Sequence, residues 1–193
     1  LGKRKQINMY WIERLSQKWS DYLCTHGGKE QEREVYEYAL TCLLNEIVID
    51  GILLIWAAVF GIAWEMILWI VVFDSLRMNI GGYHAKTPLI CEISSILIGI
   101  VCVVCAPYFV IGRLGVILVT AICLGITIRF APLINDKHPI SKERKDKARI
   151  RGSLFVGIWG VTSLCLYFVW PYGSRVGLAG MLSAIILLVI GKK

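Results

Sequence analysis

The chain of 193 residues is dominated by apolar side chains: 56% of its residues are hydrophobic and only 18% are charged, which is too apolar for an ordinary soluble domain of this size. Its net charge of +7 comes from 21 basic and 14 acidic residues. Because the basic residues lie in short stretches between apolar runs, they indicate membrane topology and not a nucleic-acid-binding surface. Composition therefore predicts an all-α integral membrane protein with the lipid bilayer as its solvent.

The first expected element is an amphipathic helix over residues 7–23. Aromatic and aliphatic residues recur there at helical spacing, with Lys and Arg on the opposite side, a pattern typical of a helix lying in the membrane interface. No apolar stretch with a small-residue cleavage site follows the first charges, so we do not expect a cleaved signal. A turn at residues 25–28 and a charged stretch then lead to the first span, which assigns residues 1–42 to a cytoplasmic or interfacial N-terminal part.

Six apolar runs follow and predict about six transmembrane helices. A full crossing needs about 20 apolar residues, and the second run is short by that measure. We find no internal repeat and no low-complexity linker, so we expect a single membrane domain over residues 1–193, with the transmembrane bundle in residues 43–190. The predicted spans are residues 43–60, 64–76, 93–111, 114–130, 153–170 and 176–190.

The distribution of basic residues predicts the orientation of these spans. Residues 1–46 hold seven Lys and Arg, residues 131–152 hold seven more, and Lys192 and Lys193 end the chain. Arg113 and Arg175 lie in the alternate connections. Since cytoplasmic loops carry the excess of Lys and Arg, we expect a multi-pass protein of the cell membrane with both termini, and the segment between the second and third runs, in the cytoplasm.

That segment, GGYHAKTPLIC, concentrates the reactive residue types of the chain. Thr87 is suited to cap a helix that begins at Pro88, which puts Cys91 near the positive end of the helix dipole, where a thiolate is favoured. His84 is the nearby imidazole able to take the thiol proton and return it to a leaving amine. Gly81 and Gly82 permit a tight approach of the backbone to a substrate. The residues alone leave a packing cysteine and a solvated histidine as alternatives.

Other reactive residues fit structural roles at least as well. Cys102 and Cys105 have the spacing of a redox pair, but they lie inside an apolar run, where a thiolate is costly. Glu46 and Asp50 lie one helical turn apart in or near the first span, and carboxylates there suggest substrate contact or bundle packing. Asp74 is expected to pair with Arg77 or to orient His84. We expect no metal and no cofactor.

The pattern around His84 resembles that of the AgrB (accessory gene regulator B) family, the membrane peptidases of Gram-positive quorum sensing. Residues Ala131-Pro132, a basic stretch and Pro139-Ile140 resemble a second segment of that family, and chain length and span number agree. The matching positions of the first segment are Arg77, Gly82, His84, Ala85, Cys91 and Ser95.

The resemblance implies a cysteine endopeptidase with Cys91 as nucleophile and His84 as base, supported by Arg77, Gly82 and Ser95. It implies removal of the acidic C-terminal tail from an AgrD-like precursor peptide, through a thioester on the enzyme that is passed to a cysteine of the peptide to close a thiolactone ring. The basic stretch after residue 136 is then expected to dock the acidic tail or anionic lipid. A homodimer stays open, as does the competing hypothesis of a non-enzymatic transporter or peptide-export partner that depends on Glu46 and Asp50.

Overall fold

The computed structural model describes residues 7–81, 88–133 and 142–191, with the side chains of residues 7–10, 31 and 88–92 left out. Within these ranges the chain forms α-helices and two short 3-10 turns, and no strand. The predicted all-α class is therefore confirmed. The chain divides into two compact units, residues 1–52 and 53–193, each described by itself below, and the single-domain assignment stays a prediction.

The first unit contains α1 (Ile7–Thr25), a 3-10 turn at Glu30–Glu32 and most of α2 (Arg33–Val59). Side chains join α1 to the start of α2: Thr41 donates to Ser16 at 2.9 Å, Gln17 donates to Glu37 at 3.0 Å, and Arg33 pairs with Asp21. Elsewhere on α1, four large apolar or aromatic side chains are exposed: Trp11, Trp19, Tyr22 and Leu23. The helix is present as expected, while its place in a membrane interface stays a prediction.

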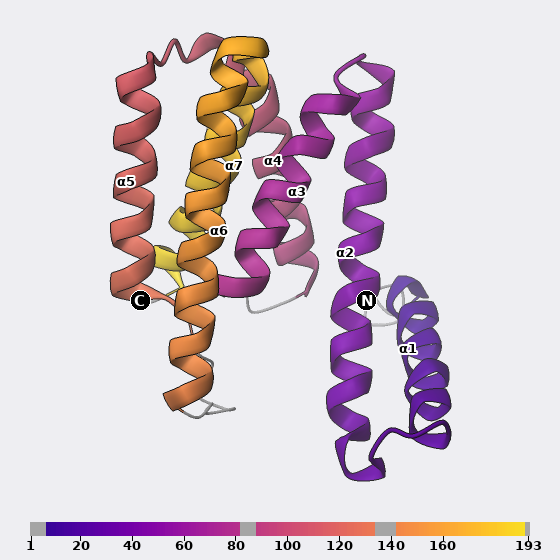
Figure 1. The fold of residues 1–193 in the computed structure, drawn as a ribbon. Helices are drawn as coiled ribbons and strands as arrows, with labels where there is room; N and C mark the ends of the chain where they lie inside the picture. Colours follow the sequence, from indigo (N-terminus) through magenta and orange to yellow (C-terminus); the bar gives the residue numbers. More distant parts are fainter. Residues whose placement is uncertain (1–6, 82–87, 134–141, 192–193) are drawn as a thin grey trace. The chain divides into compact units, whose positions relative to one another are not determined.

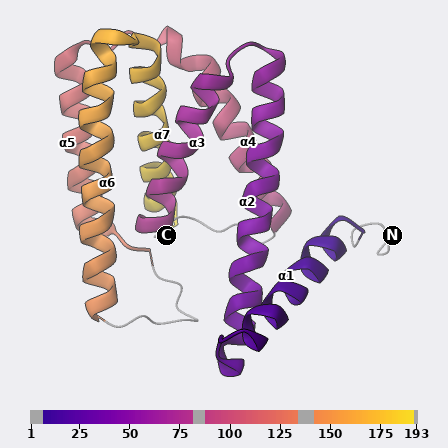
Figure 2. The same ribbon diagram turned by 45° about the vertical axis from the view of Figure 1, so that its right-hand side comes forward.

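The second unit is a helical bundle in which α7 has the central position. It contains α3 (Ala63–Ile80), α4 (Pro88–Cys105), a 3-10 turn (Ala106–Tyr108), α5 (Arg113–Phe130), α6 (Lys142–Val169) and α7 (Pro171–Ile190). Helices α3, α4, α5 and α6 all contact α7, and Figures 1 and 2 show α5, α6 and α7 standing side by side. More of α7 is buried than of any other candidate span.

Glycines on α7 allow its neighbours to approach closely. A Cβ placed on Gly180 would lie 3.1 Å from the Val72 side chain of α3, and one placed on Gly177 would lie 2.8 Å from the Ser163 hydroxyl of α6. In lipid no hydrophobic driving force brings helices together. Close van der Waals packing at small residues holds them together instead. The order of the bundle therefore depends on small residues that hydropathy alone does not single out.

Four described helices are long and apolar enough to cross a membrane: α2, α5, α6 and α7. Helix α3 is also apolar, but it carries Glu65, Asp74 and Arg77 within 18 residues, and the described apolar part of α4 and its following turn, Ile93–Tyr108, is shorter. The membrane class is thus supported, and the exact count of six spans stays a prediction.

Several predicted span ends differ from the helix ends observed, among them those of α3 and α4. Helix α3 continues past residue 76 to Ile80, where Asn79 donates to the Ser75 carbonyl at 2.7 Å, so polar residues that suggested a loop remain helical. Helix α4 ends at Cys105 and not at residue 111, because Pro107 belongs to the 3-10 turn that follows. Helix α2 begins at Arg33, so most of the charged stretch that leads to the first span is helical.

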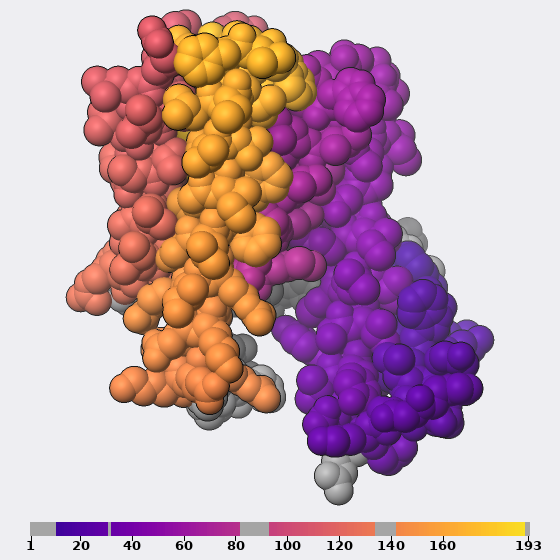
Figure 3. Space-filling model, viewed as in Figure 1, coloured from indigo at the N-terminus to yellow at the C-terminus, as the bar shows by residue number. Residues whose placement is uncertain are grey.

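The first turns of α6 project beyond the end of α5 in both ribbon views (Figures 1 and 2) and in the space-filling view (Figure 3). At 1.5 Å per residue, 28 residues of α6 span about 42 Å and 18 residues of α5 about 27 Å. The projecting end carries the basic residues Lys142, Arg144, Lys145 and Lys147, and Arg149 and Arg151 follow where α6 comes level with the end of α5. The basic stretch of the sequence is therefore largely a helix and not a loop.

Candidate active site

The start of α4 positions the predicted nucleophile. Helix α4 begins at Pro88, as the sequence predicts, because proline is tolerated in the first turn, where no amide is needed. Residue 91 is the fourth residue of this helix, within the turn where unpaired backbone N–H groups and the helix dipole create positive potential. The side chain of Cys91, the segment with Gly82 and His84, and the proposed cap at Thr87 lie outside the described residues.

Gly81 follows the last residue of α3 and is the last described residue before the segment that contains His84. Its φ of 72° and ψ of 178° fall in a region that is essentially restricted to glycine. A Cβ on Gly81 would lie 2.9 Å from the Leu133 carbonyl oxygen. Next to it, the Leu133 amide donates to the Ile80 carbonyl at 3.0 Å. The chain that leads to His84 therefore starts from a point fixed against the segment after α5.

Helix α6 completes this fixed point. Arg149 donates through Nε to the Ala131 carbonyl at 2.9 Å, and a Cβ on Gly152 would lie 2.5 Å from Cγ2 of Ile80. We call the group Ile80, Gly81, Ala131, Leu133, Arg149 and Gly152 the anchor cluster. Ile80, Ala131 and Gly152 are buried, so the cluster holds the ends of α3 and α5 to one side of α6.

Arg77 and Ser95 are the predicted supporting residues whose side chains are described. The Arg77 guanidinium lies over the Phe73 ring, 5.7 Å from its centroid, a cation–π arrangement within α3. Ser95 is 6% exposed on α4, one helical turn after residue 91, so its position shares a helix face with that residue. Their roles toward Cys91 stay predictions, as does the pairing of Asp74.

Glu46 and Asp50 belong to the first compact unit, whereas the other predicted site residues belong to the second. Both carboxylates are half-buried and one turn apart in the interior of α2. Their predicted contact with substrate or bundle is not tested by this arrangement.

The anchor cluster contains the residues that sequence reasoning missed. Neither Leu133 nor Gly152 has a role predicted from the sequence, and Arg149 counts there only among the basic residues of 131–152. No local pattern pairs Arg149 with a carbonyl 18 positions earlier. The one available signal was Gly152, directly after the run of basic residues. Glycine inside a helix lowers stability, so its presence suggests that close packing requires it there.

Comparison with known proteins gives one family. The family model described as Accessory gene regulator B matches residues 16–190, which include all the predicted site residues. A "Putative AgrB-like protein" of Clostridium perfringens (strain SM101 / Type A) is 27% identical over 152 residues, covering 74% of this chain and 71% of the relative. A "Putative AgrB-like protein 2" of Clostridium perfringens (strain 13 / Type A) is 26% identical with the same coverage. No solved structure matches significantly.

Proposed function

Since this chain belongs to the accessory gene regulator B family, we propose that it is a membrane cysteine endopeptidase that processes a quorum-sensing precursor peptide. The observation that carries the proposal is the family match over residues 16–190, together with residue 91 in the first turn of a helix that begins at Pro88. A helix start favours a thiolate, the nucleophilic form of cysteine.

In the proposed first step, His84 takes the proton of the Cys91 thiol and the thiolate attacks the carbonyl carbon of the scissile peptide bond. The tetrahedral intermediate collapses as the C–N bond breaks, and the imidazolium returns the proton to the leaving amine. The acidic tail departs with a new amino terminus. The rest of the peptide stays on Cys91 as a thioester.

In the second step, a cysteine within the bound peptide loses its proton and attacks the same carbonyl carbon. The bond to the Cys91 sulfur breaks, Cys91 leaves as a thiolate and is reprotonated, and a thiolactone ring closes. One thioester replaces another, so the exchange is close to neutral in energy, and departure of the tail drives the sequence forward. No oxidant or cofactor enters the balance.

The anchor cluster, the basic turns of α6 and the other predicted site residues also have roles in the proposed reaction. The anchor cluster fixes the end of α3, from which the chain continues to Gly82 and His84. The projecting basic turns of α6 are suited to hold an acidic peptide tail at the membrane surface. Arg77 and Ser95 are proposed to support the reacting groups, and Glu46 and Asp50 to contact the peptide.

Substitution of the two reacting residues tests the proposal. We expect Cys91→Ser and His84→Ala each to abolish tail cleavage of a co-expressed precursor, measured by mass spectrometry, with membrane insertion unchanged. Cys165→Ala, which alters an exposed cysteine, should cleave at the wild-type rate. Continued cleavage by Cys91→Ser, with loss of function only in Glu46→Gln and Asp50→Asn, would favour the transporter hypothesis instead.

A thiol-reactive probe gives an independent readout that needs no substrate. Cys24 lies in α1, and desolvation of its thiol together with the nearby charge of Glu30 raises its pKa above the ordinary value, although Arg33 lowers it. Cys24 should therefore label slowly near neutral pH and faster as the pH rises, because only the thiolate reacts. Cys91 should label faster than Cys24 at pH 7, and His84→Ala should slow Cys91 alone. Equal rates at the two cysteines would contradict an activated nucleophile.

A further inference from the structure

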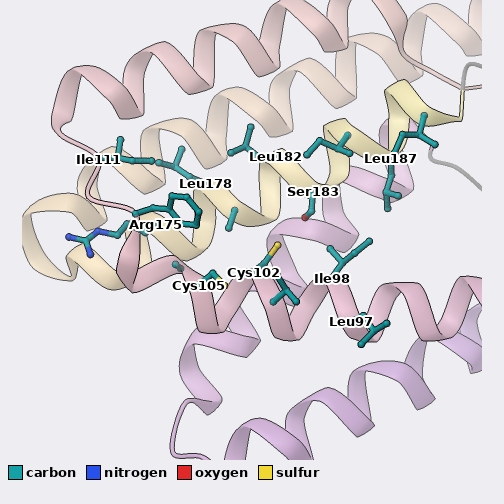
Figure 4. Close-up of a pocket in the computed structure, with 16 residues that line it drawn as sticks. Leu97, Ile98, Cys102, Cys105, Ile111, Arg175, Leu178, Leu182, Ser183 and Leu187 are labelled. Atoms are coloured by element: carbon teal, nitrogen blue, oxygen red, sulfur yellow. The ribbon is translucent and has the colours of Figure 1, made fainter.

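A cavity of about 560 Å³ lies between α4 and α7 in the second unit. Its wall is almost entirely apolar, and it includes Leu97, Ile98 and Val101 from α4 and Leu178, Leu182 and Leu187 from α7. Figure 4 shows Leu97 and Ile98 on one helix and Leu178, Leu182 and Leu187 in a row along the other. The hydroxyl of Ser183 already donates to the Gly180 carbonyl at 2.9 Å. The cavity therefore favours a long apolar occupant with no hydrogen bonds to satisfy.

Arg175 is the one charged residue among those that line the cavity, and it lies at one end of the row (Figure 4). Its Nη1 donates to the Pro107 carbonyl at 2.8 Å, which holds the guanidinium at this end. One bond uses one of the five N–H donors of an arginine. Arg175 is also the fifth residue of α7, so the positive end of the helix dipole adds to its charge. This end of the cavity is suited to an anion.

The cavity is long enough to span the hydrocarbon of one bilayer leaflet. From Arg175 to Ile190, both of which line the cavity, α7 rises about 22 Å at 1.5 Å per residue. Half of a hydrocarbon core of about 30 Å is about 15 Å. An acyl chain that starts at a head group near Arg175 therefore fits within the length of the cavity. The neighbouring face of α4 is exposed at Ile93, Leu97, Val101 and Val104, so lipid has access from the side.

We propose that the α4–α7 cavity binds the acyl chain of an anionic phospholipid, whose phosphate group pairs with Arg175. The lipid fills the space beside α4, the helix that carries Cys91, and braces it against α7. This binding site is independent of the proposed catalytic chemistry. It predicts that anionic lipid stabilises the folded protein, by an amount that rises with the ratio of lipid concentration to Kd.

The test measures lipid binding to the purified full chain by native mass spectrometry and by thermal unfolding in detergent with added phosphatidylglycerol or phosphatidylcholine. The wild type should bind phosphatidylglycerol more tightly and unfold at a higher temperature with it. Arg175→Gln should lose this preference, by about fivefold in affinity for a single basic residue. Arg113→Gln is the control, because Arg113 begins another helix and stacks on Phe168 outside the cavity. Glycerophosphoglycerol, the head group without acyl chains, should not compete.

A second pair of variants tests the apolar part. Ala179 lines the cavity, and Ala179→Trp should fill it and weaken binding of both lipids. Ala121→Trp adds the same bulk at an exposed position of α5 and should leave binding unchanged. Equal lipid binding by Arg175→Gln and Arg113→Gln, or by Ala179→Trp and Ala121→Trp, would overturn the proposal. So would a change of oligomeric state in Ala179→Trp without a change in lipid binding, which would make the cavity a contact between copies of the chain.

Discussion

At the scale of single residues, the backbone conformation of Gly81 sets the start of the chain that leads to His84. We expect Gly81→Ala to destabilise the protein by about 2 to 4 kcal/mol, since a side chain in this backbone region costs about 1 to 3 kcal/mol and its Cβ would also press on the Leu133 carbonyl oxygen. Tail cleavage should fall with it, because the chain leading to His84 starts here. Thermal unfolding and cleavage of the precursor measure the two effects.

Gly61 supplies a control for the loss of a glycine with positive φ. Its φ is 71°, but nothing lies within 4 Å of a Cβ placed there. Gly61→Ala should therefore lose less stability than Gly81→Ala and retain cleavage. If the two variants lose equal stability and activity, the contact with Leu133 carries no weight.

Residue-scale features can be predicted from the sequence when their physical cause lies within a few neighbouring residues. Pro88 begins α4 because the missing amide and fixed φ of proline suit a first turn, and this can be read from the sequence. Glycine at position 81 was expected to allow a close approach of the backbone to a substrate. In the structure the close approach is to Leu133, which no local pattern connects to it.

At the scale of elements, α3 and α6 are linked by a hydrogen bond from Trp159 Nε1 to the Ser75 hydroxyl at 2.7 Å. Ser75 in turn donates to the Val72 carbonyl at 3.0 Å. We expect Ser75→Ala to lower the unfolding free energy by about 1 to 3 kcal/mol, since it leaves the part-buried indole N–H without this acceptor. Thermal unfolding in detergent measures the loss.

A double-mutant cycle separates this bond from packing. Trp159→Phe removes the donor and retains an aromatic ring, so the double variant should lose less than the sum of the two single losses. Strict additivity would show that the bond contributes nothing to holding α3 against α6.

Hydropathy located all six later helices but misplaced some of their ends, in one case for a tertiary reason and in another for a local one. Residues 77–80 look like a polar loop, yet they extend α3, because Ile80 is buried against the Gly152 position of α6. Residues 106–111 look apolar enough to prolong α4, yet Pro107 ends it in a 3-10 turn. The short second run thus became an 18-residue helix.

At the scale of the whole molecule, the distribution of charge predicts which end of each helix faces the cytoplasm. In a chain whose native cysteines are replaced, we expect Gly112→Cys to react with a membrane-impermeant maleimide on intact cells and Lys142→Cys to react only after lysis. Both positions are exposed, and a Cβ at Gly112 meets nothing within 4 Å. Labelling of Lys142→Cys on intact cells would contradict cytoplasmic placement of the basic turns.

The sequence by itself determined the membrane class, the helical architecture and the start of α4, because apolar runs, helical spacing and proline geometry act over a few neighbouring residues. It also carried the family pattern around His84 and Cys91. Only the tertiary structure decided that Gly81 and Leu133 meet, that Arg149 reaches Ala131, and that α4 and α7 leave an apolar cavity with Arg175 at its end. These features depend on contacts between residues 18 to about 80 positions apart, whose pairing is set by the packing of helices and not by the local pattern of either partner.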